Sequence, residues 1–343
     1  MSKSEKFRIV GVALVVVVVV VVVVAAAVWA KFAFHSKSIP AASCPDVIRL
    51  SQTIADGALI ADELGLFAKH NLRIEWKGKM AHGPATIVAL AGGELDAAGS
   101  VSTAMILARA HGSKIKIVAS STLSRKDSPL FRYLVKDGRP VGTKPSDFIG
   151  KKVVASPTTI TWYPLVVWLK RGGVDPSRVE FLQLPSPLAT EQALRAGQVD
   201  VIGASETTPP GSKLVAEGGV HFLPGLSDAE ILGIEQIGGW AMREDFLQAH
   251  PDVARRFIAT LREGYVWSNA HPDSAAAILT RRNGVPVEYA KYQRVWRPVP
   301  ENAIVDSSSI RKWVAILEEF GQIPSGSINP RDVYTNEFNP SAP

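Results

Sequence analysis

Two kinds of hydrophobic pattern divide the chain into an N-terminal stretch and a long body. Residues 9–30 form a run of 22 residues without a charge, which includes ten consecutive valines. A helix rises about 1.5 Å per residue, so this run is long enough to cross the roughly 30 Å hydrocarbon core of a bilayer. Beyond residue 44, short apolar runs alternate with stretches of helical periodicity, which is typical of a folded α/β domain.

The body contains an internal repeat with an offset of about 105 residues. Three pairs of segments match: 90–99 (LAGGELDAAG) with 194–203 (LRAGQVDVIG), 73–76 (RIEW) with 178–181 (RVEF), and the apolar runs that begin at Ile48 and Val153. The first pair is offset by 104 residues and the other two by 105. Three anchors that share one offset indicate a duplicated unit.

Each copy of the unit predicts the order strand, helix, strand, helix, strand. Strands are expected at 47–51, 72–76 and 95–98, and again at 152–155, 179–182 and 199–202. Helices are expected at 58–70 and 84–92, and again at 162–172 and 190–197. Strands that alternate with helices favour parallel βαβ units, so each copy predicts one α/β lobe. Asp96 and Asp200 follow helix-ending glycines, where turn chemistry explains them better than catalysis does.

Polar side chains gather in the loops that would line a cleft between the two lobes. Ligands of parallel sheets bind beyond the carboxyl ends of the strands, where helix N-termini offer free N–H groups to a small anion. The candidate ligand-binding residues in these loops are Gln52, Thr53, Asp56, Ser100, Ser102 and Thr103 in the first copy, and Thr158, Thr159, Thr161, Trp162, Ser205 and Glu206 in the second. The alternative for each hydroxyl group is an ordinary helix cap.

Three residues near the expected cleft have two interpretations each. Trp162 and Trp240 would either contact the apolar part of a ligand or belong to the core. Glu206 would either bind an amine of the ligand or face solvent. The sequence leaves these alternatives open.

The last third of the chain predicts helices that complete the first lobe. The tripeptides 250–252 and 271–273, both His-Pro-Asp, each place a proline in the first turn of a helix. Apolar residues at helical spacing follow in 253–265 and in 310–320, so these faces are expected in the core. The two histidines are therefore expected to have structural roles.

Composition and motifs exclude several functions. The net charge is +6, but the five bases and one acid of residues 1–44 leave 33 bases and 31 acids in the body. This balance argues against a nucleic-acid partner. One cysteine excludes a disulfide framework and a CxxC site. HExxH, GxSxG, P-loop and GxGxxG motifs are missing from the sequence, so we expect no catalytic site, metal or cofactor.

The body resembles the periplasmic substrate-binding proteins of ABC importers for nitrate, sulfonates, taurine and thiamine precursors. The resemblance covers residues 47–329 and is carried by 61–68 (ADELGLFA), 95–99 (LDAAG), 148–154 (FIGKKVV), 193–200 (ALRAGQVD), 250–257 (HPDVARRF) and 267–273 (WSNAHPD). In many relatives one loop of the second lobe starts with Gly-Ser, where this chain has Pro157-Thr158-Thr159. The usual ligand contacts of that loop therefore do not carry over.

The resemblance implies an α/β, two-lobed periplasmic-binding-protein-like fold of type II, with two βα lobes joined by a two-strand hinge. Lobe I is expected at 45–142 and 238–330, and lobe II at 143–237. An N-terminal anchor or signal with a linker occupies 1–44, and a C-terminal tail occupies 331–343. The two hinge crossings are expected near 140–146 and 233–239.

The implied function is to capture a small anionic or zwitterionic organic solute and deliver it to an ABC permease and its ATPase. A sulfonate or taurine-like compound is favoured over nitrate or a thiamine-precursor pyrimidine. Two alternatives stay open. One is a membrane-anchored sensory or interaction protein with the same fold. The other is a synthase of the thiamine pyrimidine, whose cysteine-rich motif a chain with one cysteine cannot supply.

Charges before the N-terminal apolar run predict its orientation. Lys3, Lys6 and Arg8 favour a cytoplasmic N-terminus and an extracytoplasmic body. The apolar run exceeds the ~7–15 residues of a cleavable signal, which favours an uncleaved membrane anchor. Residues 41–44 (AASC) loosely resemble a lipobox but lack its leucine. Whether this segment is retained, cleaved or lipidated at Cys44 stays open.

Overall fold

The strands of the body form three β-sheets. The computed structural model describes residues 44–52, 56–80, 83–156, 159–205, 209–285, 287–292 and 299–342. Its strands are β1 (Asp46–Leu50), β2 (Leu72–Trp76), β3 (Ala97–Val101), β4 (Ile115–Leu123), β5 (Arg132–Lys136), β6 (Lys152–Val154), β7 (Glu180–Leu182), β8 (Val201–Ala204), β9 (Val220–Ser227) and β10 (Gln236–Arg243). The strand orders are β1-β2, β3-β10-β4 and β7-β6-β8-β5-β9.

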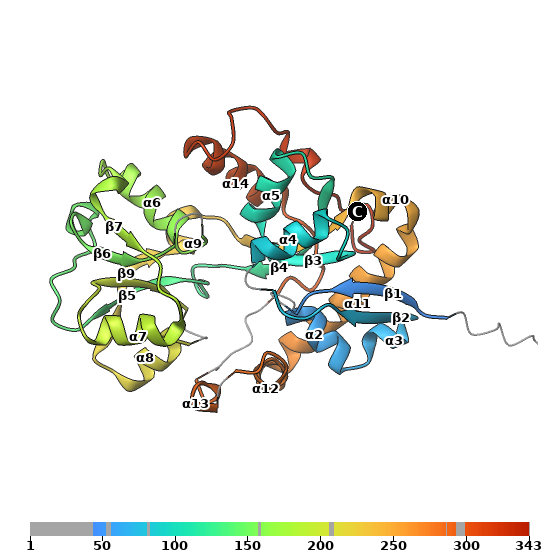
Figure 1. Ribbon diagram of the computed structural model, residues 1–343, viewed down its shortest axis with the longest axis horizontal. Helices are drawn as coiled ribbons and strands as arrows, with labels where there is room; N and C mark the ends of the chain where they lie inside the picture. Colours follow the sequence, from blue (N-terminus) through green and yellow to red (C-terminus); the bar gives the residue numbers. More distant parts are fainter. Residues whose placement is uncertain are drawn as a thin grey trace, which may run out of the picture. The chain divides into compact units, whose positions relative to one another are not determined.

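Helices cover these sheets and fill the last third of the chain. They are α2 (Asp56–Glu63), α3 (Leu66–Lys69), α4 (Gly83–Ala91), α5 (Ser102–Ala110), α6 (Trp162–Arg171), α7 (Pro187–Arg195), α8 (Gly211–Glu217), α9 (Asp228–Leu232), α10 (Glu244–Ala249), α11 (Pro251–Ala270), α12 (Pro272–Arg282), α13 (Val287–Ala290) and α14 (Ser307–Glu319). In the five-stranded sheet, α6 and α9 lie on one face and α7 and α8 on the other (Figure 1). We call this sheet with its helices lobe II, and the two smaller sheets with theirs lobe I.

Most of the predicted elements are present, with small shifts at their ends. The strand expected at 72–76 is β2, and the one expected at 199–202 begins two residues later as β8. The helix expected at 58–70 is two helices, α2 and α3. Gly65 separates them with a φ of 69°, in the left-handed region that favours glycine, and so ends the helical hydrogen-bond pattern.

The strands of the repeat that pair with one another are parallel, as predicted, whereas the two strands that follow the crossings are antiparallel to their neighbours. The pairs β1–β2, β6–β7 and β6–β8 are parallel, as expected for βαβ units. However, β10 is antiparallel to both β3 and β4, and β5 is antiparallel to both β8 and β9. The crossings between the lobes explain this. The carboxyl ends of β3 and β8 lie at the crossings, so a strand that enters either sheet from a crossing runs in the opposite direction to them.

Two crossings connect the lobes, and the first lies upstream of its predicted position. The chain leaves lobe I after Leu123 and enters the five-stranded sheet at Arg132, so residues 140–146 already belong beside that sheet. It returns through α9 to β10 at Gln236, within the predicted 233–239. The crossings run side by side, since Ser124 N–H donates to Glu235 O (2.8 Å) and Asp228 N–H donates to Phe131 O (3.1 Å).

Equivalent hydrogen bonds recur in the two copies of the repeat. In lobe I, Arg49 N–H donates to the Asp96 carboxylate (2.9 Å), and Asp96 N–H donates to Arg49 O (3.0 Å). In lobe II, Lys152 N–H donates to the Asp200 carboxylate (2.9 Å), and Asp200 N–H donates to Lys152 O (2.9 Å). Asp96 and Asp200 therefore join neighbouring strands, which is the structural role expected of them.

The strand registers correct the offset of the first strand in the repeat. Arg49 pairs with Glu75 in lobe I, and Lys152 pairs with Glu180 in lobe II. Arg49 therefore corresponds to Lys152, an offset of 103 residues rather than the 105 predicted from the apolar runs. A two-residue shift keeps the same side chains on the buried face, so the apolar pattern alone could not detect it.

The core of lobe I depends on the C-terminal helices, as predicted. Proline occupies the first turn of α11 and of α12, where its missing N–H costs nothing. Val253, Phe257, Leu261 and Tyr265 of α11 are all buried. On α14 the predicted apolar face is buried except for Phe320, which is half-buried.

Residues 45–343 form one compact unit. Among the residues that the structure describes, no helix is both long and apolar enough to span a bilayer. The apolar run at 9–30 lies outside the described residues.

Candidate functional site

The strand registers of lobe I direct the carboxyl end of β3 toward the crossings. Val101, the last residue of β3, lies opposite Gly238 of β10. Gly238 is two residues beyond Gln236, where β10 begins after the return from lobe II. The N-terminus of α5, which follows Val101 directly, therefore lies at the side of lobe I where the chain crosses.

Lobe II has the same orientation. Ala204, the last residue of β8, lies opposite Arg132, the first residue of β5 after the first crossing. Because β6 is parallel to β8, the loop after β6 lies at the same end of this sheet. The carboxyl ends of β3, β6 and β8 thus point toward the boundary between the lobes.

Buried hydroxyl groups without a partner mark the lobe I side of this boundary. Ser100 of β3 and Ser102 of α5 are 1% and 0% exposed, and Thr103 is also buried. The Oγ atoms of Ser100 and Ser102 have no hydrogen-bond partner among the described residues. Burying a hydroxyl group without a hydrogen bond costs about 1–3 kcal/mol. Within the described part of the chain, this cost is left uncompensated at both positions.

Ser120 of β4 belongs to the same group and was missed by the sequence analysis. Its register partner in β10 is Gly239, which is also the partner of Ser100, so the three residues follow one another across the sheet. Ser120 is 1% exposed and its Oγ also has no partner among the described residues. The signal in the sequence is the polar run 120–122 (SST) at the end of an otherwise apolar strand.

Gln52 and Asp56 lie beyond the end of β1 in the same lobe. The backbone N–H of Gln52 donates to Gly78 O (3.0 Å). Asp56 is the first residue of α2, and its carboxylate accepts a hydrogen bond from the Asn283 amide (3.3 Å). Asp56 is exposed as a residue, yet the surrounding protein desolvates its carboxylate and raises its pKa above the ordinary value. The hydrogen bond from Asn283 offsets part of this rise.

The hydroxyl groups of Thr159 and Thr161 in lobe II are used within their own loop. Thr159 Oγ1 donates to Ser156 O (2.5 Å) and lies 3.0 Å from Thr161 Oγ1. The Tyr133 hydroxyl donates to Thr161 O (2.8 Å), which ties this loop to β5. Ser205 is buried at the end of β8. These contacts hold Thr159 and Thr161 to Ser156 and to β5.

Trp162 lies in an aromatic cluster that connects the lobes. Its ring contacts Phe181 of lobe II and Phe320 beyond α14, with centroid distances of 6.1 and 6.2 Å. The neighbouring Tyr163 packs on Trp313 of α14 (6.1 Å). The Tyr163 hydroxyl is buried without a partner among the described residues, and burial raises its pKa to about 12.

Trp240 is a core residue, which corrects its interpretation as a candidate ligand contact. It is 1% exposed, and its indole N–H donates to the Tyr265 hydroxyl (3.2 Å). Its ring packs edge-on against Phe257 at a centroid distance of 5.4 Å. Both the polar and the apolar parts of this side chain are therefore occupied by the core of lobe I.

Three of the candidate residues, Thr53, Thr158 and Glu206, lie outside the described residues. Within the described part of the chain, no group of three or more His, Cys, Asp or Glu side chains could hold a metal ion. Cys44, the one cysteine of the sequence, is exposed.

Comparisons with known proteins identify the relatives of this chain. The sequence profile of a family described as NMT1/THI5 like matches residues 53–275. A taurine-binding periplasmic protein of Escherichia coli (strain K12) is 27% identical over 305 residues, which cover 84% of this chain and 90% of that protein.

Solved structures share the fold. The periplasmic aliphatic sulphonate-binding protein SsuA from Escherichia coli has a TM-score of 0.68 at 20% identity, covering 84% of this chain and 97% of that one. The desulfurization enzyme DSZB has a TM-score of 0.56 at 14% identity, covering 85% and 97%. These likenesses confirm the predicted two-lobed fold of the periplasmic-binding-protein class.

Proposed function

Because the chain belongs to the NMT1/THI5-like family, we propose that it is the extracytoplasmic solute-binding component of an ABC importer. The favoured ligand is a sulfonate or a taurine-like zwitterion. The relative matched over most of its length is a periplasmic binding protein. This match also supports the prediction that the chain is not an enzyme. The binding protein is 27% identical to the chain, whereas the enzyme DSZB shares the fold at only 14% identity.

The observation that carries this proposal is the set of unpartnered hydroxyl groups at Ser100, Ser102 and Ser120. They lie beside the N-terminus of α5, whose first N–H groups have no side-chain cap. Neutral donors and a positive helix end stabilise an anionic head group without a lysine or arginine. We assign the sulfonate to this side of the boundary.

Lobe II completes the site when the lobes close around the hinge. Thr159, Thr161 and Ser205 lie at the facing end of its sheet, with Trp162 at the edge. Thr158 and Glu206 belong to the same loops by their sequence positions. In this arrangement the ammonium group of a zwitterion binds Glu206, and the closed form is the one that the permease and its ATPase receive.

The N-terminal segment gives the protein its location. We propose that residues 9–30 remain as an uncleaved membrane anchor, because the run is longer than a cleavable signal and bases precede it. Mass spectrometry of the protein purified from membranes distinguishes the intact N-terminus from a chain that is cut or acylated at Cys44.

Ligand binding tests the proposed function directly. The chain from residue 45 onward is titrated with taurine, ethanesulfonate, nitrate and a thiamine-precursor pyrimidine, with the melting temperature and calorimetry as readouts. A ligand that binds only the native form raises the melting temperature. We expect a response to the two sulfonates. A response to none of the four compounds contradicts the proposal.

A matched pair of serines separates a ligand-binding role from a cap. Ser102→Ala should weaken sulfonate binding about tenfold while the ligand-free melting temperature stays constant or rises, because its hydroxyl has no partner among the residues that the structure describes. The control is Ser309→Ala. Ser309 is also buried in a first helical turn, but its hydroxyl bonds to Asp306 (2.5 Å). This variant should lose stability and keep its affinity. Loss of stability in Ser102→Ala would mark Ser102 as structural.

A further inference from the structure

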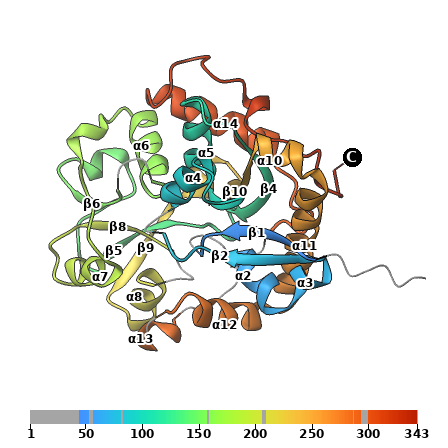
Figure 2. The same ribbon diagram turned by 45° about the vertical axis from the view of Figure 1, so that its right-hand side comes forward.

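A short segment of the C-terminal part reaches from lobe I to lobe II. The helix α12 belongs to lobe I, because the Arg282 guanidinium binds Asp62 (2.7 Å) and Glu63 (3.0 Å) of α2. Asn283 follows and donates to Asp56 (3.3 Å), at the end of the lobe I sheet that faces the boundary. The next helix, α13, lies beside α8 of lobe II in both views (Figures 1 and 2).

Two tyrosines make the contact with lobe II. The Tyr292 hydroxyl donates to the Glu217 carboxylate of α8 at 2.9 Å. The Tyr289 hydroxyl donates to the Glu191 carboxylate of α7 at 3.3 Å. Each tyrosine is only 8% exposed, so both side chains are packed into the contact. Lys213 of α8 lies over the Tyr289 ring, 5.1 Å from its centroid.

The two carboxylates belong to a charged network that lobe II forms by itself. Glu191 is 5% exposed and binds Lys213 (2.7 Å), while Glu217 binds Arg195 (2.6 Å). The Tyr292 hydrogen bond is the largest of the effects that lower the pKa of Glu217, so the carboxylate is ionised at neutral pH. Hydrogen bonds to ionised groups are about twice as strong as neutral ones. The tyrosines therefore bind a surface that is already ordered.

We propose that residues 287–292, with Tyr289 and Tyr292 as contacts, form a clasp between the lobes that must detach when the cleft opens. The two backbone crossings allow the lobes to rotate, whereas the clasp, like the aromatic cluster around Trp162, is an attachment made only of side chains. It follows Asn283, which binds Asp56 of lobe I, and its last tyrosine binds the C-terminal end of α8, so it spans the boundary between the lobes. The clasp then sets the rate of ligand release, and this part of the inference rests on the proposed function.

The test compares the full chain, purified in detergent, with its Tyr289→Phe/Tyr292→Phe variant. Hydrogen exchange of the α13 amides, measured without ligand, reports detachment. We expect exchange to rise tenfold or more, since each substitution removes a hydroxyl bound to a carboxylate of the lobe II charged network. Stopped-flow release of a bound sulfonate should become about fivefold faster or more. Tyr334→Phe is the control, because Tyr334 is half-buried in lobe I and its hydroxyl makes no contact with lobe II among the described residues.

Unchanged α13 exchange in the double variant overturns the clasp. If the double variant unfolds, Glu217→Gln replaces it, because that change weakens one clasp contact from the lobe II side and should raise the same exchange rates. The exchange readout needs no ligand. Failure of the wild-type protein to bind sulfonates therefore contradicts the proposed function and leaves the clasp to be judged by exchange alone.

Discussion

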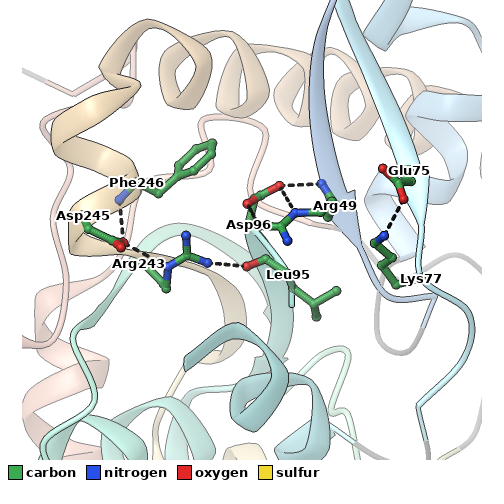
Figure 3. Close-up of polar contacts among 8 residues, drawn as sticks. All are labelled: Arg49, Glu75, Lys77, Leu95, Asp96, Arg243, Asp245 and Phe246. Atoms are coloured by element: carbon green, nitrogen blue, oxygen red, sulfur yellow. Dashed lines mark hydrogen bonds and ion pairs between the residues drawn. The ribbon is translucent and has the colours of Figure 1, made fainter. Parts of the chain in front are cut away.

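The Asp96 carboxylate binds both the backbone N–H of Arg49 (2.9 Å) and the guanidinium of the same residue (2.5 Å), and so joins β1 to the start of β3. Figure 3 shows this pair between the two strands, with Arg243 of β10 donating to Leu95 O beside it (2.7 Å). Asp96 is largely buried, whereas Arg49 is one-third exposed. The hydrogen bond to Asp96 raises the pKa of Arg49, so the guanidinium stays charged.

Removing this carboxylate should destabilise lobe I more than the equivalent change destabilises lobe II. Asp96→Ala leaves a buried N–H group and a cation without their acceptor, and should cost about 2–4 kcal/mol in urea unfolding. Asp200→Ala should cost about half as much, because Asp200 is more exposed and its arginine partner lies 3.7 Å away. The exposed Asp127 provides the control, Asp127→Asn. Equal costs at all three positions would contradict the strand-joining role.

The burial of Trp240 predicts that its substitution changes stability rather than affinity. Trp240→Phe removes the hydrogen bond to Tyr265 and part of the packing on Phe257. The unfolding free energy should fall by about 1–3 kcal/mol. Ligand affinity of the folded protein, measured by calorimetry, should stay within twofold. A stable variant with lost affinity would return Trp240 to the ligand site.

Close packing of β10 between its neighbours predicts that a methyl group at Gly239 is not tolerated. A Cβ atom there would lie 2.4 Å from Ala119 O and 3.2 Å from a methyl carbon of Ile117. Gly239→Ala should therefore destabilise lobe I by about 1–3 kcal/mol or more. Gly92→Ala is the control, since its Cβ would come no closer than 3.4 Å to Val88 O. Similar melting temperatures for the two variants would show that β10 can shift.

The ion pairs of Glu263 predict a stability difference that depends on pH. Lys69 is the largest of the effects that lower the pKa of Glu263 below its ordinary 4.5, and His70 adds to it. A carboxylate with a lowered folded-state pKa stabilises the protein above its unfolded pKa, and loses that contribution as the pH falls through the folded value.

Wild type should therefore melt above Glu263→Gln at pH 7, and the gap should close as the pH is lowered below about 4.5. The exposed Glu94, changed to Gln, serves as the control and should show no gap at either pH. If the difference in melting temperature grew in acid, the pKa of Glu263 would be raised in the folded state, which would contradict the stabilising ion pairs.

Local patterns in the sequence predicted much of the fold, and contacts between distant segments limited the rest. The repeat and the βαβ order follow from neighbouring residues, so their elements lie within a few residues of the predicted positions. The antiparallel β10 was missed because nothing within residues 236–243 records that β3 and β4 will be its partners. The same holds for the first crossing, since β5 joins the five-stranded sheet through β8 and β9.

In the candidate site, too, local sequence patterns identified some residues, whereas others depend on contacts with distant segments. Ser100 and Ser102 were predicted because they follow a predicted strand and start a helix. Ser120 was missed because it lies in β4, a strand that the repeat did not predict, so the polar run at its end was not assigned to the cleft. A tryptophan such as Trp240 looks the same in the sequence whether it lines a cleft or lies in the core. Its assignment needed Tyr265 and Phe257, which are brought to it by the fold.

The central place of β10 in its sheet has a consequence for biosynthesis. All strands of lobe II lie between residues 132 and 227, so this lobe is complete before β10 emerges from the ribosome. At about 5–20 residues per second, translation from residue 123 to residue 236 takes roughly 6–23 s. During that interval β3 and β4 each lack their shared neighbour and present open edges, which favour aggregation. The open edges of β3 and β4 therefore persist until residues 236–243 are available to pair with both strands.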